Sequence, residues 1–227
     1  MLTAMVLAAT LAGTPSPESA TPGTALPASQ PTLTREAPLA EAIAHYETVA
    51  SYRVTIHSFH GDGEEYIRYY YKRPGYVRME FIKPHAGALL VFSPASGRVR
   101  LWPFGYGHFP ELNLSPRNPL IRSPRGQYVN HSDVGALFEN TRLLQDQGHT
   151  DVRGTEVLDG RTVVHLITTG ADGVAVDGVH RIEMWLDTTT WFPVRIVSSD
   201  RQGAMIESVT MDGLELNPDL PDVLFNP

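Results

Sequence analysis

The segment from Tyr70 to Phe81 constrains the fold more than any other part of the chain. It reads YYKRPGYVRMEF and sets an Arg-Pro-Gly step between two runs of mainly aromatic and β-branched residues. Such residues favour a pleated, half-buried surface, whereas proline cannot donate to a strand ladder and glycine permits unusual backbone conformations. The segment therefore predicts a strand, a tight break and a second strand.

Similar runs recur along the chain, separated by turn residues such as Asp159-Gly160. Short loops between successive strands imply antiparallel neighbours. The predicted strands are 52–59, 65–73, 76–82, 87–93, 97–103, 150–158, 161–169, 179–187, 192–200, 203–211 and 213–216.

Two segments have helical spacing of apolar residues instead. Pro38 suits a first helical turn and begins a predicted helix over 38–50. A second helix is predicted over 133–147, with Ser132 or Asp133 as its cap and Gly148 as its stop. The pattern predicts a mainly β, α+β fold, namely a strongly curved antiparallel sheet that forms an open half-barrel of about 10–11 strands, with the helices covering its concave face.

Composition limits the partners and the chemistry. The chain has 227 residues, a formal net charge of −7 and no cysteine. The negative charge argues against nucleic acid as a partner. The absence of cysteine removes disulfides, thiolate nucleophiles and acylation on cysteine, so the chain is not itself a lipoprotein. We expect no cofactor.

Three regions are expected. Residues 1–13 are apolar and resemble a short signal peptide, and residues 14–36 form a Pro/Ser/Thr/Ala-rich linker that we expect to be disordered. Residues 37–227 then form a single domain. The Pro- and Gly-rich segment 103–130 has no steady period and is predicted to be a lid or loop insertion.

Motifs for catalysis are not found. The sequence lacks a Gly-x-Ser-x-Gly elbow, a phosphate-binding Gly-Lys loop, a dinucleotide fingerprint and a His-Glu-x-x-His pair. His57 and His60, with Asp62 and Glu64 nearby, are the one metal-like cluster, but residues 57 and 60 of a strand face opposite sides. We therefore predict no enzyme activity and no metal site.

The order of several motifs points to a family. Lys83-Pro84 and the run 88–92 follow the first hairpin, and the strand 98–104 ends in Trp-x-Phe. A late hairpin over 183–197 and the ending 217–225 complete the order. Over residues 37–227 this order resembles the periplasmic lipoprotein carriers of the LolA family, in the LolA/LolB-like superfamily of outer-membrane lipoprotein-sorting proteins.

The resemblance implies a soluble, monomeric periplasmic carrier. Its partners would be the acyl chains of lipoproteins or lipids and the membrane-associated proteins that donate and accept them. Arg73 matches the arginine that, in this family, points towards the cavity mouth, hydrogen-bonds lid backbone and assists cargo transfer. An ordinary exposed arginine before a turn proline is the alternative interpretation.

Strand alternation supplies candidates for the ligand-binding wall. They are Tyr69, Tyr71, Val77, Met79, Phe81, Leu90, Phe92, Leu101 and Met184, accompanied by Val54, Ile56, Ile67, Ile182 and Leu186. The same alternation also fits a closed, dry core, so both interpretations stay open at this point.

Two other functions are compatible with the sequence. A periplasmic sensor or regulatory module would use the same fold to contact another protein in a lipid-linked manner. An enzyme on a β scaffold would need a motif that the sequence lacks. In the long segment, Arg117, Arg122 and Arg125 either contact an acidic or phosphate head group or keep a loop soluble.

Overall fold

A computed structural model describes residues 37–61, 63–123 and 127–226. The predicted signal peptide at 1–13 and linker at 14–36 lie outside these residues, as do Asp62 and Arg125.

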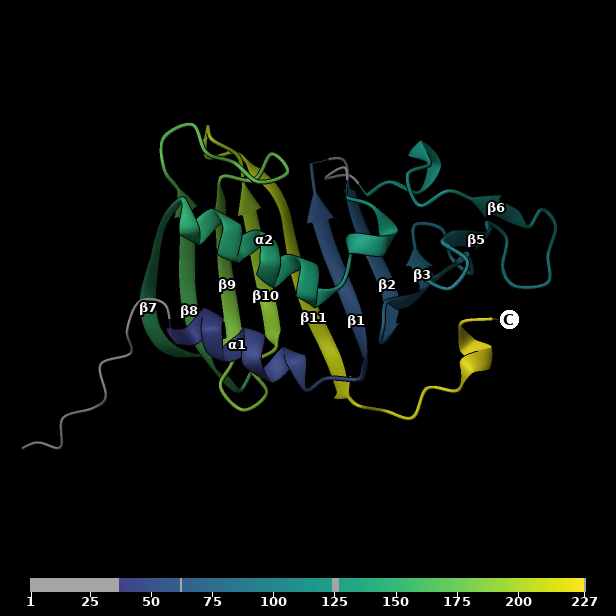
Figure 1. The fold of residues 1–227 in the computed structure, drawn as a ribbon, viewed down its shortest axis with the longest axis horizontal. Helices are drawn as coiled ribbons and strands as arrows, with labels where there is room; N and C mark the ends of the chain where they lie inside the picture. Colours follow the sequence, from purple (N-terminus) through teal and green to yellow (C-terminus); the bar gives the residue numbers. More distant parts are fainter. Residues whose placement is uncertain (1–36, 62, 124–126, 227) are drawn as a thin grey trace, which may run out of the picture. The chain divides into compact units, whose positions relative to one another are not determined.

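One antiparallel sheet of eleven strands organises the described residues (Figure 1). Its spatial order is β6-β5-β4-β3-β2-β1-β11-β10-β9-β8-β7, so each strand except β1 and β11 pairs only with its sequence neighbours. The strands are β1 Ser51–His60, β2 Gly63–Lys72, β3 Tyr76–Lys83, β4 Leu89–Ser93, β5 Arg98–Trp102, β6 Leu112–Leu114, β7 Gly148–Leu158, β8 Arg161–Gly170, β9 Arg181–Asp187, β10 Pro193–Ser199 and β11 Met205–Leu216.

This sheet confirms the predicted fold class, a mainly β, open antiparallel half-barrel with two helices. Two details of the strand prediction were wrong. β6 lies inside the segment that was predicted to be irregular, because its three residues offer too short a pattern. The predicted strands 203–211 and 213–216 are one strand, since Gly213, at φ 61°, is accommodated by an irregularity in the pairing of β1 with β11.

Both helices lie on the same face of the sheet (Figure 1). Helix α1, Ala37–Glu47, buries Leu39, Ala42 and Tyr46. Helix α2, Val134–Asp146, contacts α1, β7 and β8. Asp133 caps its start, and the Asp133 side chain accepts hydrogen bonds from the backbone N–H groups of Gly135 and Ala136. Short 3₁₀ turns follow Asn118, Tyr128 and Pro221; they are η1 Pro119–Ile121, η2 Val129–His131 and η3 Asp222–Leu224.

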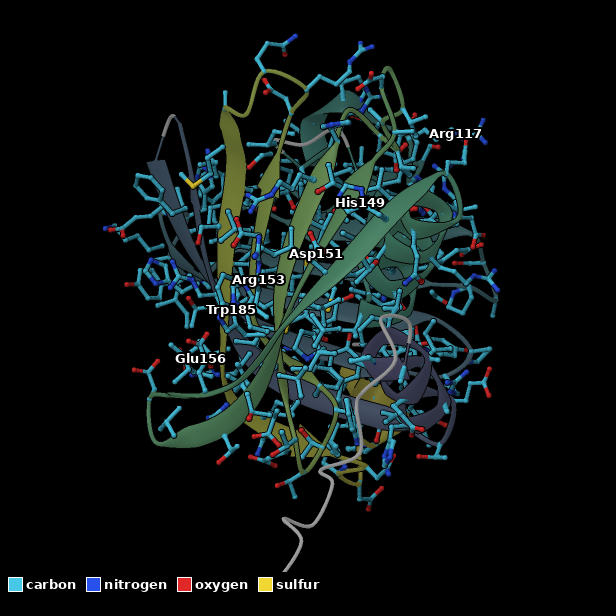
Figure 2. The ribbon with its side chains drawn as sticks, turned by 90° about the vertical axis from the view of Figure 1, so that its left-hand side faces the viewer. Arg117, His149, Asp151, Arg153, Glu156 and Trp185 are labelled. Carbon is cyan, nitrogen blue, oxygen red and sulfur yellow. The ribbon has the colours of Figure 1, made fainter. Side chains whose placement is uncertain are left out.

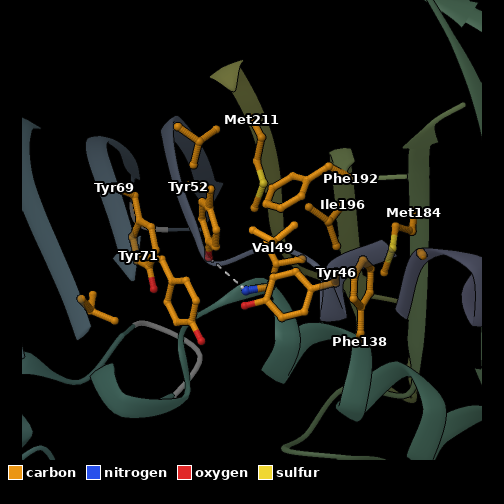
Figure 3. Close-up of a cluster of buried hydrophobic side chains, with 14 of the residues drawn as sticks. Tyr46, Val49, Tyr52, Tyr69, Tyr71, Phe138, Met184, Phe192, Ile196 and Met211 are labelled. Carbon is orange, nitrogen blue, oxygen red and sulfur yellow. Dashed lines mark hydrogen bonds between the residues drawn. The ribbon is translucent and has the colours of Figure 1, made fainter. Parts of the chain in front are cut away.

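The core between the sheet and the helices is rich in aromatic rings (Figure 3). Tyr52 stacks on Tyr71 with ring centroids 5.1 Å apart, and Phe192 meets Tyr52 edge-on at 5.0 Å. Tyr46 from α1 reaches Phe138 from α2 at 5.9 Å. Because these rings come from both helices, from β1 and β2 and from Phe192 directly before β10, they fix the helices against both halves of the sheet.

A second cluster lies on the opposite face of the sheet, where the C-terminal segment packs against β2, β4 and β5. Leu220 and Phe225 of the C-terminal segment belong to this cluster, together with Val91 of β4 and Trp102 of β5. Lys72 donates to the carbonyl oxygen of Leu220 at 2.9 Å. The segment thus covers apolar surface that the helices cannot reach.

The outer face near edge strand β7 carries a polar and aromatic stack. Trp185 Nε1 donates to Glu156 Oε1 at 2.5 Å, and the ring of His165 stacks on Trp185 with centroids 4.2 Å apart. Arg195 lies 5.1 Å from the Trp185 ring. Figure 2 shows Trp185 beside Glu156 of β7, with His149 and the other labelled β7 residues further along that strand.

Candidate ligand-binding cavity

A cavity of about 700 Å³ opens on the helix-bearing face of the sheet. Its floor is formed by inward-facing residues of β1 to β5, β10 and β11. Residues 120–123 and 127–134, which include η2 and the start of α2, cover it. The volume falls within the range of about 300–1,000 Å³ that is typical of small-molecule sites.

The floor is apolar because the strand register aligns one face of each strand. Tyr69, Met79, Leu90 and Leu101 are consecutive cross-strand partners on β2, β3, β4 and β5. Opposed residues of an antiparallel pair point to the same side, so this row forms a continuous surface. The remaining apolar floor residues are Val54, Ile56, Ile67, Phe81, Ala88, Ile196, Val209 and Met211.

Tyrosine hydroxyl groups hold the cover on the floor. The backbone N–H of Val134 donates to the hydroxyl oxygen of Tyr52 at 3.2 Å. The hydroxyl of Tyr69 shares a hydrogen bond of 3.1 Å with Oγ of Ser132, which itself donates to the carbonyl oxygen of Val129 at 2.7 Å. Cover and floor are therefore joined at the start of α2.

The same tyrosines are held in the neutral form. Burial raises the pKa of Tyr46, Tyr52 and Tyr69 well above the ordinary value for a phenol. For Tyr46, the nearby carboxylate of Asp133 raises the pKa further. These phenols therefore serve as hydrogen-bonding groups, not as bases.

One end of the cavity is polar. Ser58, His60 and Glu65 come from the β1–β2 hairpin, Glu207 from β11, and His85 from the β3–β4 connection. The hydroxyl of Ser58 donates to Oε1 of Glu207 at 3.0 Å. Burial raises the pKa of Glu65, as does the charge of Glu207, while His60 and His85 act in the opposite direction.

Comparisons with known proteins rest on structure alone, because no protein-family model and no curated protein sequence match this chain. An uncharacterized conserved protein from Thermus thermophilus is similar with a TM-score of 0.53 and 13% identity, over 83% of this chain and 91% of that one. The lipoprotein LppX of Mycobacterium tuberculosis is similar with a TM-score of 0.50 and 11% identity, over 82% of this chain and 97% of that one. A LolA superfamily protein from Nitrosomonas europaea has a TM-score of 0.36 and 14% identity, over 86% of this chain and 98% of that one.

The fold is the one that the first two of these structures share, and it agrees with the LolA-like fold expected from the motif order. This confirms the resemblance that the motif order indicated. At these identities the likeness concerns the fold, and the site has to be judged on the side chains of this chain.

The sheet places eight of the predicted wall residues in the cavity, namely Val54, Ile56, Ile67, Tyr69, Met79, Phe81, Leu90 and Leu101. The other six do not line it and lie in the packed core: Tyr71, Val77, Phe92, Ile182, Met184 and Leu186. Contact with a ligand stays a prediction.

Arg73 is not among the residues that line the cavity. Its Nε donates to the carbonyl oxygen of Val49 at 2.6 Å, and its Nη2 donates to that of Tyr46 at 2.8 Å. The Tyr46 carbonyl belongs to the last turn of α1 and the Val49 carbonyl follows the helix, a region where backbone acceptors lack partners within the helix. Arg73 thus binds helix-end backbone, and its role as a latch stays a prediction.

Strand alternation omitted the polar wall residues. Ser58, His60 and Glu65 have the inward parity of Ile56 and Ile67, which a search for apolar side chains passes over. Period-2 spacing extended to polar residues would have found them. The cover residues have no such periodic signal, but residues 120–123 and 127–129 lie in the segment 103–130, which its lack of a steady period predicted to be a lid or loop insertion.

The metal-like histidines are separated in the structure. His57 stacks on Tyr66 and lies 3.2 Å from Glu64, whereas His60 lines the cavity. No group of three or more His, Cys, Asp or Glu residues within the described ranges could hold a metal ion.

Two arginines of the long segment can be placed. Arg122 lines the cavity and lies 5.1 Å from the Tyr128 ring. Arg117 is exposed. The part of the chain that the structure describes contains no helix with the length and apolar character needed to cross a membrane.

Proposed function

We propose that this protein is a soluble periplasmic carrier that binds the acyl chain of a lipid or lipoprotein in the cavity and passes it to an acceptor in the cell envelope. The observation that carries the proposal is the continuous apolar floor under a cover of irregular structure. A core of similar composition normally leaves few voids larger than a water molecule. A cavity of about 700 Å³ with apolar walls is suited to an extended hydrocarbon.

The energies are compatible with both binding and release. Burial of an acyl chain contributes roughly 0.8 kcal/mol per CH₂ group, so twelve to sixteen carbons supply on the order of 10 kcal/mol before costs. The cover is joined to the floor by a few neutral hydrogen bonds, including those of Tyr52 and Tyr69. Each contributes only about 1 kcal/mol, so cargo can displace part of the cover.

The proposal includes the membrane-associated donor and acceptor proteins that such a carrier requires, and no cofactor and no catalytic step. It follows from the fold and from the chemistry of the wall, which offers hydrocarbon contacts along most of its length.

Native mass spectrometry of gently purified protein, followed by solvent extraction, tests this function. We expect a non-covalent adduct of lipid mass, which extraction removes and incubation with phospholipid or an acylated peptide restores. A protein that stays free of ligand after incubation with both would overturn the proposal.

A regulatory module that acts by protein contact is the second candidate. It is favoured by the exposed aromatic segment that follows β5, in which the exposed fractions are 69% for Phe104, 59% for Tyr106 and 92% for Phe109. Large exposed apolar side chains that gather on one loop are typical of interaction sites. In this case the cavity ligand would control a contact made by the loop.

Substitution of Phe109 by Ser separates the two candidates. For a carrier we expect ligand binding and stability to be unchanged. For a regulatory module, the variant would retain its ligand but lose a protein partner that the native chain captures in a ligand-dependent manner.

A further inference from the structure

The polar end of the cavity indicates what the head group of the ligand must be. Glu65 lies on the inward face of β2, two residues before Ile67, and its half-buried carboxylate lines the cavity. Among the described residues, no group forms a hydrogen bond or ion pair with this carboxylate. A carboxylate accepts hydrogen bonds only, so this half-buried side chain offers the cavity an acceptor that no described protein group occupies.

The neighbouring side chains do not supply Glu65 with a hydrogen-bond donor. Ser58 is its cross-strand partner on β1, but the Ser58 hydroxyl donates to Glu207 at 3.0 Å. Glu207 is buried and adds a second negative charge on the same side of the cavity. Burial raises the Glu65 pKa, as does the charge of Glu207, whereas the nearby His60 and His85 lower it.

A histidine side chain at this end of the cavity also has a ring nitrogen without a hydrogen-bond partner among the described residues. Nε2 of His60 is buried and has no hydrogen-bond partner within the described residues. The end of the cavity therefore presents a carboxylate acceptor and a histidine nitrogen that the fold itself leaves unused.

We propose that the cavity selects acyl lipids whose head group carries a primary ammonium, with Glu65 as the group that accepts its hydrogen bonds. An ammonium has three donors and a positive charge, which complements the two carboxylates better than a hydroxyl group does. An anionic head group would meet repulsion from Glu65 and Glu207. The hydrocarbon would then extend from Glu65 along the apolar row towards Leu90 and Leu101.

This inference rests on the proposed function, because it concerns the head group of the same cargo. The rival cation at the cavity is Arg122, which comes from the cover and stacks on Tyr128. If Arg122 bound the head group, an anionic lipid would bind best. The two assignments therefore predict opposite orders of affinity.

Calorimetric titration with three single-chain probes distinguishes them. Dodecylamine, dodecanol and dodecanoate share their hydrocarbon and differ in the charge of the head group. At neutral pH we expect dodecylamine to bind at least about tenfold more tightly than dodecanol, and dodecanoate to bind more weakly than dodecanol. Equal affinities, or tightest binding of dodecanoate, would overturn the head-group proposal while leaving the carrier intact. Failure of all three to bind would overturn the carrier itself.

Two variants locate the effect. Glu65→Gln should abolish the advantage of dodecylamine over dodecanol while the affinity for dodecanol changes by less than about twofold, because the apolar wall is intact. Glu139→Gln, an exposed position on α2 away from the cavity, removes the same charge and should keep the full advantage. Loss of the advantage in both variants would show a general effect of the negative protein and overturn the assignment to Glu65.

Discussion

The hydroxyl of Tyr46 donates to Oδ1 of Asp133 at 2.9 Å, which joins the last turn of α1 to the capping residue of α2. The same Oδ1 accepts the backbone N–H of Gly135 at 2.7 Å. A single carboxylate oxygen thus fixes the start of one helix and the end of the other. Because Val134, the next residue, is held by Tyr52, this pair also sets the position of the cavity cover.

Tyr46→Phe should lower the free energy of unfolding by about 1–2 kcal/mol, since it removes one buried hydrogen bond and leaves the ring contacts with Phe138 in place. Urea denaturation measures the loss. Tyr106→Phe removes a hydroxyl from an exposed ring and should leave stability unchanged. Equal losses in both variants would contradict the role of the Tyr46–Asp133 bond.

Stability should fall steeply in alkali. The folded pKa values of Tyr46, Tyr52 and Tyr69 are raised above the unfolded value of about 10, so their contribution is complete below about pH 10 and is lost as the pH rises beyond it. Each tyrosine adds a slope of roughly 1.4 kcal/mol per pH unit. Urea denaturation at about pH 8 and about pH 11 measures the difference, and Tyr46→Phe should lower the slope by roughly the 1.4 kcal/mol per pH unit of one tyrosine. A flat profile would contradict the neutral, buried state.

Met79→Trp should block the cavity, because the larger side chain projects from the middle of the apolar row. We expect the affinity for a long-chain fatty alcohol to fall at least about tenfold, measured by calorimetry. Ile82→Trp places the same side chain at an exposed position of the same strand and should leave binding unchanged. Binding that survives Met79→Trp would place the ligand elsewhere.

Arg73→Met should lower the free energy of unfolding by about 2–4 kcal/mol, since two charge-assisted hydrogen bonds to the end of α1 are lost. Arg73→Lys should recover part of this loss through one donor. Denaturation of both variants measures the effect. If Arg73 is also a latch, a bound fatty alcohol should be released faster from Arg73→Met, which stopped-flow dilution measures. An unchanged release rate would mean that Arg73 only anchors α1.

Gly148→Ala should destabilise the protein by about 2–3 kcal/mol or more. An added Cβ would overlap the carbonyl oxygen of Thr169 and come within 2.7 Å of Cα of Gly170, and neither backbone atom can move freely. Gly61→Ala is the matched control, since its added Cβ meets no atom within 4 Å. Thermal denaturation compares them, and similar melting temperatures would show that the α2–β7 corner can relax.

The local pattern of the chain determined much of the fold. Alternation placed Tyr69, Met79 and Leu90 on the inward face, and helical spacing located α1 and α2 to within three residues at each end. These features follow from short-range sterics and from the periods of strand and helix, which neighbouring residues express directly. The motif order of the two halves added the LolA-like arrangement.

Only the tertiary structure decided which inward residues face a cavity. Tyr71 and Met184 share the parity of Tyr69 and Met79, yet the helices and the opposite half of the sheet cover them. A strand pattern specifies a face but not what packs on it, because the cover comes from residues far away in the chain. For the same reason, the carboxylate of Glu65 could be assigned to the polar end of a cavity only once Glu207 of β11 and the covering segment were placed around that end.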